Sequence, residues 1–460
     1  MVGRVKPLLA AWGDGYADIR WEENRRVRIT FQGKKLTECK CTATAGGHVR
    51  AFSGGGKALL SVSQPEDLPQ ALAGARAAAR ALGMARSRPI ELAAAAALRG
   101  EYPLSPGQDP RDIPLREKID LLSHYNSLAL DVPGIVTTLA YYEEWSSRRT
   151  FLSSEGAEIH YELMLVNLGV RAVARRGQVI QTTHIAFGGS EDFSRLLGRE
   201  EELRERAEMA VRLLSAVPAQ AGTFPVILDP DEAGLFIHEA FGHLSEADGL
   251  QYNPSFRARL TLGVEIAAPV LSVVDDPNLP GLPGSYPVDD EGVPGLRTQL
   301  IREGVLTGRL HSRETAAEFS EPLSGNMRAV DATYTPVVRM SNIFIEPGPH
   351  PFQEMLAAVE DGYYLVGAKG GQTSGDQFTF GAQWGWRIRG GRLAELVRDI
   401  NMSGELFSTL KRIRMVGNDL RFSERGGCGK GGIGPMQLNP KSGKGAPHIL
   451  ISEVTIGGRG

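Results

Sequence analysis

The segment LFIHEAFGHLSEAD (residues 235–248) holds two histidines, and Glu239 follows the first of them, His238. Two histidines four residues apart on a helix, with a glutamate next to the first, form a well-known zinc-binding pattern. Here the second histidine is His243, five residues after the first. In a regular α-helix these side chains would diverge by roughly 140°, so that both imidazoles cannot reach one zinc ion. The segment is therefore either a metal site on a distorted helix or a helix with two ordinary histidines.

A local distortion of the helix would make the five-residue spacing usable. A π-type or unwound turn places residues i and i+5 nearly one above the other, and such turns are frequent at functional sites. Gly242 lies between the two histidines, and glycine is the residue at which a backbone is most easily distorted. Asp229 and Pro230 resemble an N-cap and a first helical residue, so we expect a helix from there. Glu239 would then stand beside a bound ion and could act as a general base.

A catalytic zinc site also needs a third protein ligand, and Cys428 is the best candidate. It lies in SERGGCGKGGIG (residues 423–434), where the flanking glycines would let the backbone bring a thiolate close to another segment. Lys430, two residues later, would favour the thiolate form. The alternative is an ordinary cysteine in a glycine-rich loop. The segment does not fit a phosphate-binding loop, because it lacks the first glycine and the final Ser or Thr of that pattern.

Further acidic residues follow these candidates in the sequence. Glu246 and Asp248 come soon after His243, and either one could orient its ring by a hydrogen bond. They could equally be solvated acids at a helix end. Residues 289–291 (Asp-Asp-Glu) form an acidic run, which is either a turn with capping carboxylates or a feature of the site mouth.

A series of longer segments resembles a known protein family. The resemblance covers most of residues 225–460 in order, and the first 90 residues resemble the family less specifically. The segments are HEAFGH, SEAD, SVVDDPNLPGLPGSYPVDDEGVP, LIREGVL, GNMRA, PVVRMSNIFIEPG, DGYYLVGAKGG and GGCGKGG…VTIGG. Together they are similar to the TldD/PmbA family, whose members are described as modulators of DNA gyrase and as microcin-processing peptidases.

The resemblance implies a zinc-dependent peptidase with an HExxxH motif and a distant cysteine. Carried over to this chain, the ligands are His238, His243 and Cys428, and the general base is Glu239. All four are present, which resembles the active TldD branch rather than the PmbA (TldE) branch, whose members lack the ligands and serve as partners. The resemblance also implies a dimer, either of two copies or with a PmbA/TldE-like subunit, and a site that opens into an enclosed chamber.

These implications give an expected function with two alternatives. We expect hydrolysis of peptide bonds in unfolded or extended peptides, in which zinc activates a water molecule and Glu239 transfers its proton to the leaving amine. Edge pairing with a strand of the protein could hold an extended peptide. The alternatives are a catalytically inactive partner subunit of the PmbA/TldE type and a zinc amidohydrolase that acts on small molecules.

The pattern along the chain predicts an α+β protein with three parts. Residues 1–100 are expected to form a small α/β domain, in which Glu23-Asn24 lies where a hairpin turn would fall, and a helix covers residues 68–83. Residues 101–222 are expected to form a second α/β region with a long helix over 191–215. Residues 223–460 are rich in glycine-punctuated extended runs, which predicts a mainly antiparallel, barrel-like or curved sheet that carries the histidine helix.

The overall composition is that of an ordinary globular protein. The 460 residues are 42% hydrophobic and 23% charged, and the net charge of −3 offers no electrostatic case for binding nucleic acid or an anionic membrane. Apolar runs such as LAAAAAL (residues 92–98) are far shorter than the ~20 residues that span a bilayer. The N-terminal run LLAAW is too short for a secretory signal, and three cysteines suit a reducing compartment, so we expect a cytoplasmic protein.

Overall fold

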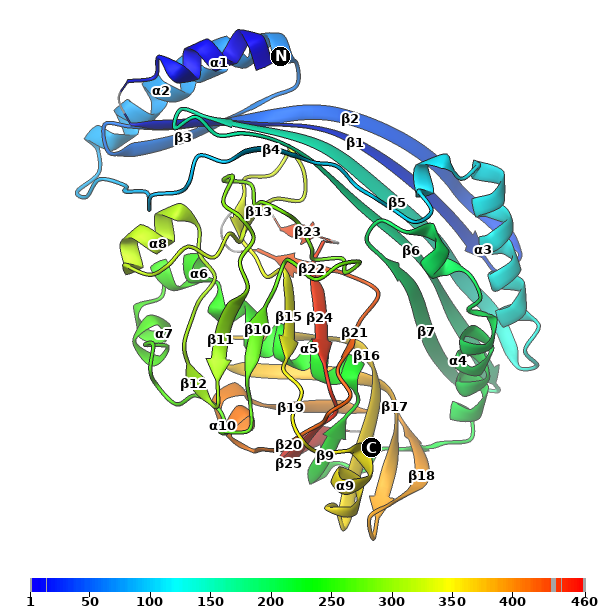
Figure 1. Ribbon diagram of the computed structural model, residues 1–460. Coiled ribbons are helices and arrows are strands. Elements are labelled where there is room, and N and C mark those ends of the chain that lie inside the picture. The colour runs from blue at the N-terminus through cyan, green and yellow to red at the C-terminus, as the bar shows by residue number, and fades with distance from the viewer. Residues whose placement is uncertain (1, 14, 432–435, 440, 458–460) are drawn as a thin grey trace.

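The computed structural model describes residues 2–13, 15–431, 436–439 and 441–457. It shows a long, curved N-terminal sheet that arches over a C-terminal half built from a barrel and a second sheet (Figure 1). The predicted α+β class, with a barrel-like and mainly antiparallel C-terminal half, is confirmed. None of the helices in the described part of the chain is long and apolar enough to cross a membrane.

The N-terminal sheet has the strand order β3-β2-β1-β5-β6-β4, and β7 also pairs with β6. Its strands are β1 (Tyr16–Gln32), β2 (Lys35–Ser53), β3 (Gly56–Val62), β4 (Arg99–Tyr102), β5 (Ile135–Ser153), β6 (Glu158–Arg176) and β7 (Val179–Gly189). One sheet therefore joins strands from the first 100 residues to strands from the next 100. Because β1, β2, β5 and β6 are 17 to 19 residues long, the sheet can reach across the whole C-terminal half.

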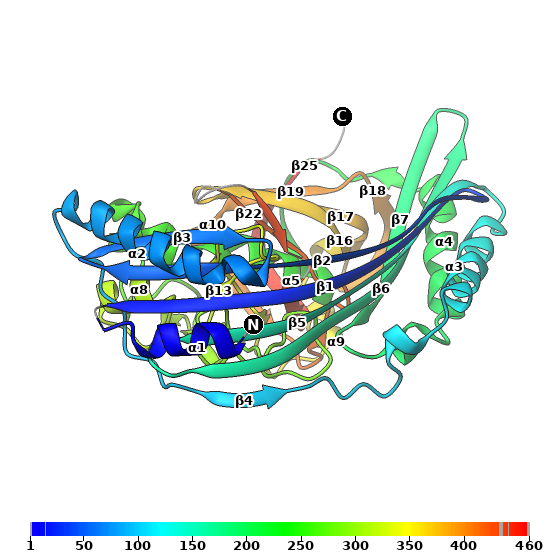
Figure 2. The same ribbon diagram turned by 90° about the horizontal axis from the view of Figure 1, so that it is seen from above.

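Two pairs of helices cover the face of this sheet that points away from the C-terminal half (Figures 1 and 2). The first pair, α1 and α2, packs at one end on a core that includes Trp12, Ile19 and Leu72. The second pair, α3 and α4, packs at the other end around Tyr125, Tyr142 and Phe187. The helices are α1 (Val2–Ala10), α2 (Leu68–Met84), α3 (Leu115–Leu130) and α4 (Glu200–Leu213).

Two sequence-based expectations for this half are wrong. The helix predicted over 191–215 begins only at Glu200, because Gly198 has a left-handed backbone (φ +71°) that separates α4 from a short 3-10 turn over Phe193–Leu196. The hairpin turn expected at Glu23-Asn24 is absent from the described chain, since β1 runs through both residues. Glu22 and Asn24 are buried although they are polar, and polar residues in the middle of a strand give its sequence the look of a turn.

The C-terminal half is organised around a closed barrel. Strand β16 pairs with β9 on one side and with β17 on the other, which closes the ring β16-β9-β25-β19-β17. Only the β9–β16 pair of the ring is parallel. The barrel strands are β9 (Gly222–Leu228), β16 (Asp361–Ser374), β17 (Gln377–Arg389), β19 (Asn401–Glu405) and β25 (Ile449–Gly457), and the strands attached to them are β8 (Val217–Pro218), β18 (Arg392–Arg398) and β20 (Ile413–Val416).

A second sheet, of order β12-β11-β10-β15-β24-β21, lies beside the barrel, and helix α5 (Pro230–Ala240) contacts both. Phe236 of α5 packs edge-on against Phe378 and Phe380 of the barrel, with ring centroids 5.4 and 6.2 Å apart. The helix is therefore fixed in the largest apolar core of the protein. The strands of the second sheet are β10 (Val273–Asp275), β11 (Thr298–Arg302), β12 (Val305–Leu306), β15 (Asn342–Ile345), β21 (Arg421–Phe422) and β24 (Gly443–Ala446).

Short elements complete the C-terminal half. They are the pairs β13 (Met327–Arg328) with β14 (Val337–Val338) and β22 (Cys428–Lys430) with β23 (Gln437–Asn439), and the helices α6 (Ala247–Gln251), α7 (Pro254–Arg259), α8 (Arg313–Phe319), α9 (Phe352–Ala357) and α10 (Leu406–Lys411).

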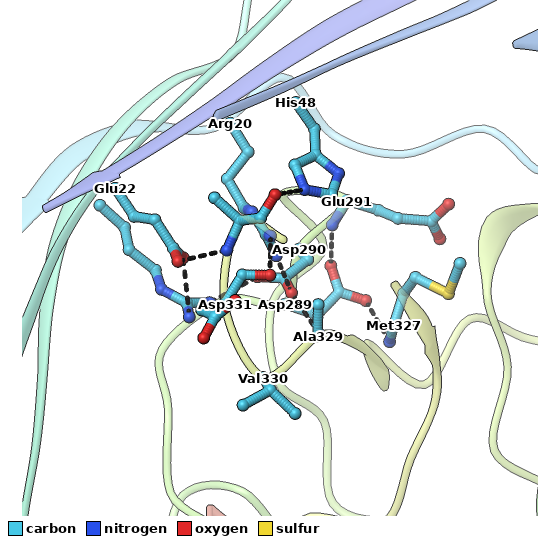
Figure 3. A network of polar contacts seen from close by, with 12 residues as sticks. Arg20, Glu22, His48, Asp289, Asp290, Glu291, Met327, Ala329, Val330 and Asp331 are labelled. Atoms are coloured by element: carbon cyan, nitrogen blue, oxygen red, sulfur yellow. Dashed lines mark hydrogen bonds and ion pairs between the residues drawn. The ribbon is translucent and has the colours of Figure 1, made fainter. Parts of the chain in front are cut away.

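A buried network of charges joins the two halves, and the acidic run 289–291 is its centre (Figure 3). Asp290 pairs with Arg20 of β1 and with Arg149 of β5, whose Nη1 lies 2.8 Å from Asp290 Oδ1. These two arginines hold the pKa of Asp290 at about 2, although burial alone would raise it. Asp289 accepts the backbone N–H of Met327 at 2.9 Å. The run thus includes capping carboxylates, and Asp290 fixes the curved sheet over the C-terminal half.

Candidate metal centre

The two histidines of the metal-site candidate lie at the end of α5 and in the turn that follows it. Asp229 caps the helix by accepting the backbone N–H of Glu232 at 2.9 Å, and Pro230 is its first residue, as the sequence predicts. The helix ends at Ala240, and a 3-10 turn over Gly242–Ser245 follows. The distortion expected near Gly242 is therefore the end of the helix itself, and the described part of the chain contains no π-type turn.

This change of backbone brings the two imidazoles together. The rings of His238 and His243 lie 5.5 Å apart between centroids, at 82° to each other. Gly242 has no room for a side chain, because a Cβ atom there would lie 2.1 Å from the sulfur of Met340. The glycine is thus needed for the close approach of the turn to the neighbouring segment as well as for the turn itself.

The structure brings Cys428 to the same place from 185 residues farther along the chain. Its Sγ lies 3.3 Å from His243 Nε2, and the ligand atoms of His238, His243 and Cys428 all lie within 4.8 Å of one another. The backbone of the cysteine is held by the buried Arg339, which donates from Nη2 to the Cys428 carbonyl at 2.7 Å. The three ligands predicted from the resemblance therefore converge on one point.

The chemistry of this group fits a zinc ion. His238 is fully buried, and neither of its ring nitrogens has a hydrogen-bond partner in the described chain. Burial, together with the charges of His243 and Lys444, lowers the pKa of His238 well below its ordinary value, so that its ring is neutral and keeps a lone pair for a ligand. An unpaired buried imidazole is costly, and a cation bound there would remove the cost. Two imidazoles and a thiol are a donor set that zinc favours.

His243 is oriented by a carboxylate. Its Nδ1 lies 3.0 Å from Glu246 Oε2, which leaves Nε2 pointing to Cys428. Burial lowers the pKa of His243, but the carboxylate of Glu246 and the contact with Cys428 outweigh burial and place the pKa well above the ordinary value. The protein surroundings therefore favour a positive charge at this position, and a bound cation would satisfy the same requirement.

The other predicted supporting residues form one buried network with Glu246. Lys430 Nζ lies 2.9 Å from Glu246 Oε2 and 2.7 Å from Asp248 Oδ1, and it also donates to the Val338 carbonyl at 2.7 Å. The ammonium of Lys430 thus contacts these carboxylates rather than the thiol. Because Glu246 and Asp248 are buried and paired, they are not solvated helix-end acids. Burial would raise the pKa of Glu246, but Lys430 and His243 lower it, so the carboxylate stays ionised.

Glu239 lies beside the two rings, with its carboxylate partly open to solvent. Its side chain is 22% exposed, and Oε2 is 3.8 Å from His243 Nε2. Burial raises the pKa of Glu239 above the ordinary value, which makes it a better proton acceptor. The backbone carbonyl of Glu239 accepts a hydrogen bond from Thr373 Oγ1 of β16 at 3.0 Å, which fixes this turn of the helix against the barrel.

Sequence reasoning missed Arg339, Thr373 and Lys444. Arg339 holds the backbone of the cysteine, Thr373 holds the helix, and the positive charge of Lys444 acts on both His238 and Glu239. Arg339 lies in the segment PVVRMSNIFIEPG, but nothing in that segment indicates its task, and all three residues reach the site only through the packing of the barrel and the second sheet.

Comparison with known proteins finds relatives along nearly the whole chain. Family models described as PmbA/TldA metallopeptidase domain 1, central domain and C-terminal domain match residues 17–85, 108–216 and 221–458. A metalloprotease of Synechocystis is 37% identical over 96% of this chain and 95% of its own length. A zinc metalloprotease TldD homolog of Saccharolobus solfataricus is 31% identical over 70% of this chain and 71% of its own length.

Solved structures share the fold. A chain from Thermotoga maritima, described as a candidate modulator of a DNA gyrase, has a TM-score of 0.81 at 20% identity and covers 99% of this chain and 100% of its own. TldE from Thermococcus kodakarensis has a TM-score of 0.76 at 18% identity, with both chains covered completely. The family models and the relatives, and not the fold alone, therefore decide the assignment: this chain belongs to the PmbA/TldD family of metallopeptidases.

Proposed function

We propose that this protein is a TldD-like zinc metallopeptidase that hydrolyses peptide bonds in unfolded or extended peptides. The observation that carries the proposal is the group of the buried His238 and Cys428 with the half-buried His243, and with the carboxylate of Glu239 beside it. These three residues would hold the zinc ion, and Glu239 would serve as the general base. Relatives named metalloprotease and zinc metalloprotease support the same class of reaction.

Each of these residues has a separate task. Zinc in such a site supplies Lewis-acid polarisation of a carbonyl group and makes water more acidic. Glu239 accepts a proton from the attacking water and delivers it to the leaving amide nitrogen. Glu246 fixes the ring of His243 through Nδ1, so that Nε2 stays available as a ligand. Arg339 positions the backbone of Cys428.

The barrel also offers an edge on which an extended peptide could bind. Strand β16 pairs with β9 only over Tyr363–Leu365, but it continues to Ser374. Beyond Leu365, that side of β16 has no strand partner in the described part of the chain, and Thr373 of this stretch contacts Glu239. A substrate held by backbone pairing here would be selected for an extended conformation rather than for its sequence.

The test is a pair of substitutions with opposite outcomes. Glu239→Gln should keep its zinc and lose cleavage of casein and short peptides, because it removes only the proton acceptor. Cys428→Ala should lose zinc affinity by at least tens-fold, because it removes a ligand. Glu201→Gln, an exposed change on α4, is the matched control and should affect neither property. Cleavage that survives in Glu239→Gln would exclude this residue as the base.

Two alternatives give different results in the same experiments. An inactive partner subunit would carry less than about 0.2 zinc per chain after gentle purification. A zinc amidohydrolase would cleave small amides but neither casein nor peptides. The expected dimer, of two copies or with a PmbA/TldE-like subunit, and the cytoplasmic location stay predictions.

A further inference from the structure

A cavity of about 560 Å³ lies between the two halves of the protein, next to the metal centre. One wall is formed by β6, β7 and α4 of the N-terminal half, and the other by α5, β16 and the segment 421–427. It therefore lies under the end of the curved sheet that α3 and α4 cover (Figure 1). None of the three proposed zinc ligands lines it, so it is a separate space that adjoins the site.

The cavity approaches Glu239 along one face of α5. Asp231 and Leu235 line the cavity, and Glu239 is the next residue in the same row at a spacing of four. With a rise of 1.5 Å per residue, the cavity wall at Leu235 is about 6 Å from Glu239 along the helix, and the wall at Asp231 is about 12 Å away. Gly427, the residue before Cys428, also lines the cavity. The cavity thus begins about one helical turn from the proposed base.

The charged lining of this cavity is mainly cationic. Seven arginine and lysine side chains and four carboxylates line it, in a chain whose net charge is −3. Two of the cations are matched by carboxylates of the lining. Arg199 pairs with both Glu202 and Glu424, and Arg206 lies in the field of the two aspartates at the start of α5.

Five cations remain without an ion-pair partner in the part of the chain that the structure describes. They are Arg171, Lys369, Arg421, Arg425 and Lys444. Of the two aspartates at the start of α5, Asp229 is half-buried, and burial and the charge of Asp231 raise its pKa to about 7. The cavity has an excess of positive charge that the protein does not itself neutralise.

His184, on β7 in the same wall, responds to this charge. Burial, Arg206, Arg171, Arg425 and Lys369 all lower the pKa of His184, to about 4. A histidine that is partly exposed and still stays neutral at pH 7 agrees with a positive potential across the cavity.

We propose that this cavity is a subsite for carboxylate groups of the substrate, supplied by Asp or Glu side chains or by a C-terminal carboxylate. The proposal rests on the proposed peptidase function and adds a substrate preference to it. An extended peptide advances about 3.3 Å per residue, so the stretch from about 6 to 12 Å along α5 corresponds to about two to four residues from the scissile bond. The subsite therefore favours an acidic group at that distance on one side of the cleaved bond.

Binding of labelled peptides to the zinc-loaded Glu239→Gln protein tests the subsite without turnover. The peptides form a matched set in which one position carries Glu or Gln and the C-terminus is free or amidated. We expect the peptides with a carboxylate to bind about tenfold more tightly than their neutral counterparts at low salt, with the difference falling below about twofold at 0.5 M salt. The Glu/Gln pair and the acid/amide pair show which carboxylate is bound.

Two substitutions locate the effect. Arg171→Gln and Lys369→Gln should each reduce the preference for carboxylates severalfold, without changing the affinity for the neutral peptide. Arg204→Gln, an exposed change on α4 outside the cavity, is the control and should leave the preference intact. Equal binding of acidic and neutral peptides, or a preference that both variants retain, would overturn the proposal.

Cleavage by the unmodified protein separates this proposal from the proposed function. If neutral and acidic peptides are cut at the same rate, the peptidase stands and the subsite is wrong. If acidic peptides bind preferentially but no peptide is cut, the subsite stands and the peptidase is wrong. With both correct, mass spectrometry of the products should place the acidic residue two to four positions from the cut.

Discussion

Replacing Glu246 with Gln tests how the protein orients the ring of His243. The carboxylate of Glu246 receives three contacts: His243 Nδ1 at 3.0 Å, Lys430 Nζ at 2.9 Å and the backbone N–H of Met340 at 3.2 Å. Glutamine has nearly the same shape but only one acceptor oxygen, and its amide group donates. At least one of these buried donors must then face another donor.

The size of the effect follows from these contacts. A buried donor left without an acceptor costs about 1–3 kcal/mol. Loss of a hydrogen-bonded partner behind a metal-binding histidine typically lowers metal affinity 10- to 100-fold, which is about 1.4–2.7 kcal/mol. We therefore expect zinc affinity to fall by that factor, because His243 can now rotate or adopt the other tautomer. The zinc-free protein should also lose stability, since Lys430 keeps Asp248 as its only carboxylate partner.

Zinc affinity is measured by competition with a chelator of known affinity, and stability by urea unfolding of the zinc-free protein. Glu201→Gln controls for the loss of a charge at an exposed site. The double variant Glu246→Gln/Lys430→Met should lose less stability than the sum of its single variants, because the two residues share one buried pair. Zinc affinity within twofold of the unmodified protein would show that Glu246 does not orient His243, and the reasoning would be wrong.

Two further predictions concern the contacts between the halves of the protein. The carboxylate of Glu424 binds Arg199 through two contacts of 2.9 Å and accepts the Gly188 N–H at 3.0 Å. Glu424→Gln removes this carboxylate, so the segment before Cys428 should loosen, and the protein should release zinc to excess chelator several-fold faster. An unchanged rate would mean that Arg339 alone holds the cysteine. For His48, burial and the charge of Arg20 lower the pKa from 6.5 to about 4, so the unfolded chain takes up a proton between these pH values before the folded one does. The free energy of unfolding should therefore fall by about 3 kcal/mol as the pH drops from 6.5 to 4. Urea unfolding should show a smaller fall for His48→Gln, because glutamine does not titrate. An equal dependence of the unfolding free energy on pH in both proteins would contradict this account.

Local patterns in the sequence predicted many of the elements. The helix expected over 68–83 is α2 at Leu68–Met84, since its apolar residues recur on one helical face and pack on the N-terminal sheet. The start of α5 at Asp229 and Pro230 was predictable, because an N-cap and a first-turn proline act through neighbouring backbone groups. The glycine-rich extended runs indicated a β-rich C-terminal half for the same local reason.

Sequence patterns are misleading or incomplete where polar residues are buried by partners from distant strands. Glu23-Asn24 resembles a turn, but the strand continues through it, because the neighbouring Glu22 is buried and pairs with Arg149 at 3.0 Å. The acidic run 289–291 left a turn with capping carboxylates and a feature of the site mouth as alternatives, and its arginine partners on the curved sheet could not be foreseen. Such residues obey no local rule, because their partners come from distant strands.

For the metal centre, the sequence indicated which residues could be ligands, but not that their side chains lie together in the folded protein. The order of residues showed that His238, Glu239 and His243 lie on one short segment, and the glycine-rich surroundings of Cys428 made it the best candidate for a third ligand, as the resemblance also implied. Only the folded chain ends the helix at Ala240, places a thiol from 185 residues away beside one imidazole, and puts a cavity lined by cations that are unpaired in the described chain about one helical turn from Glu239. The physical reason is that backbone and side-chain preferences act over a few neighbouring residues, whereas ligand geometry and electrostatic potential depend on which distant segments the packed core brings together.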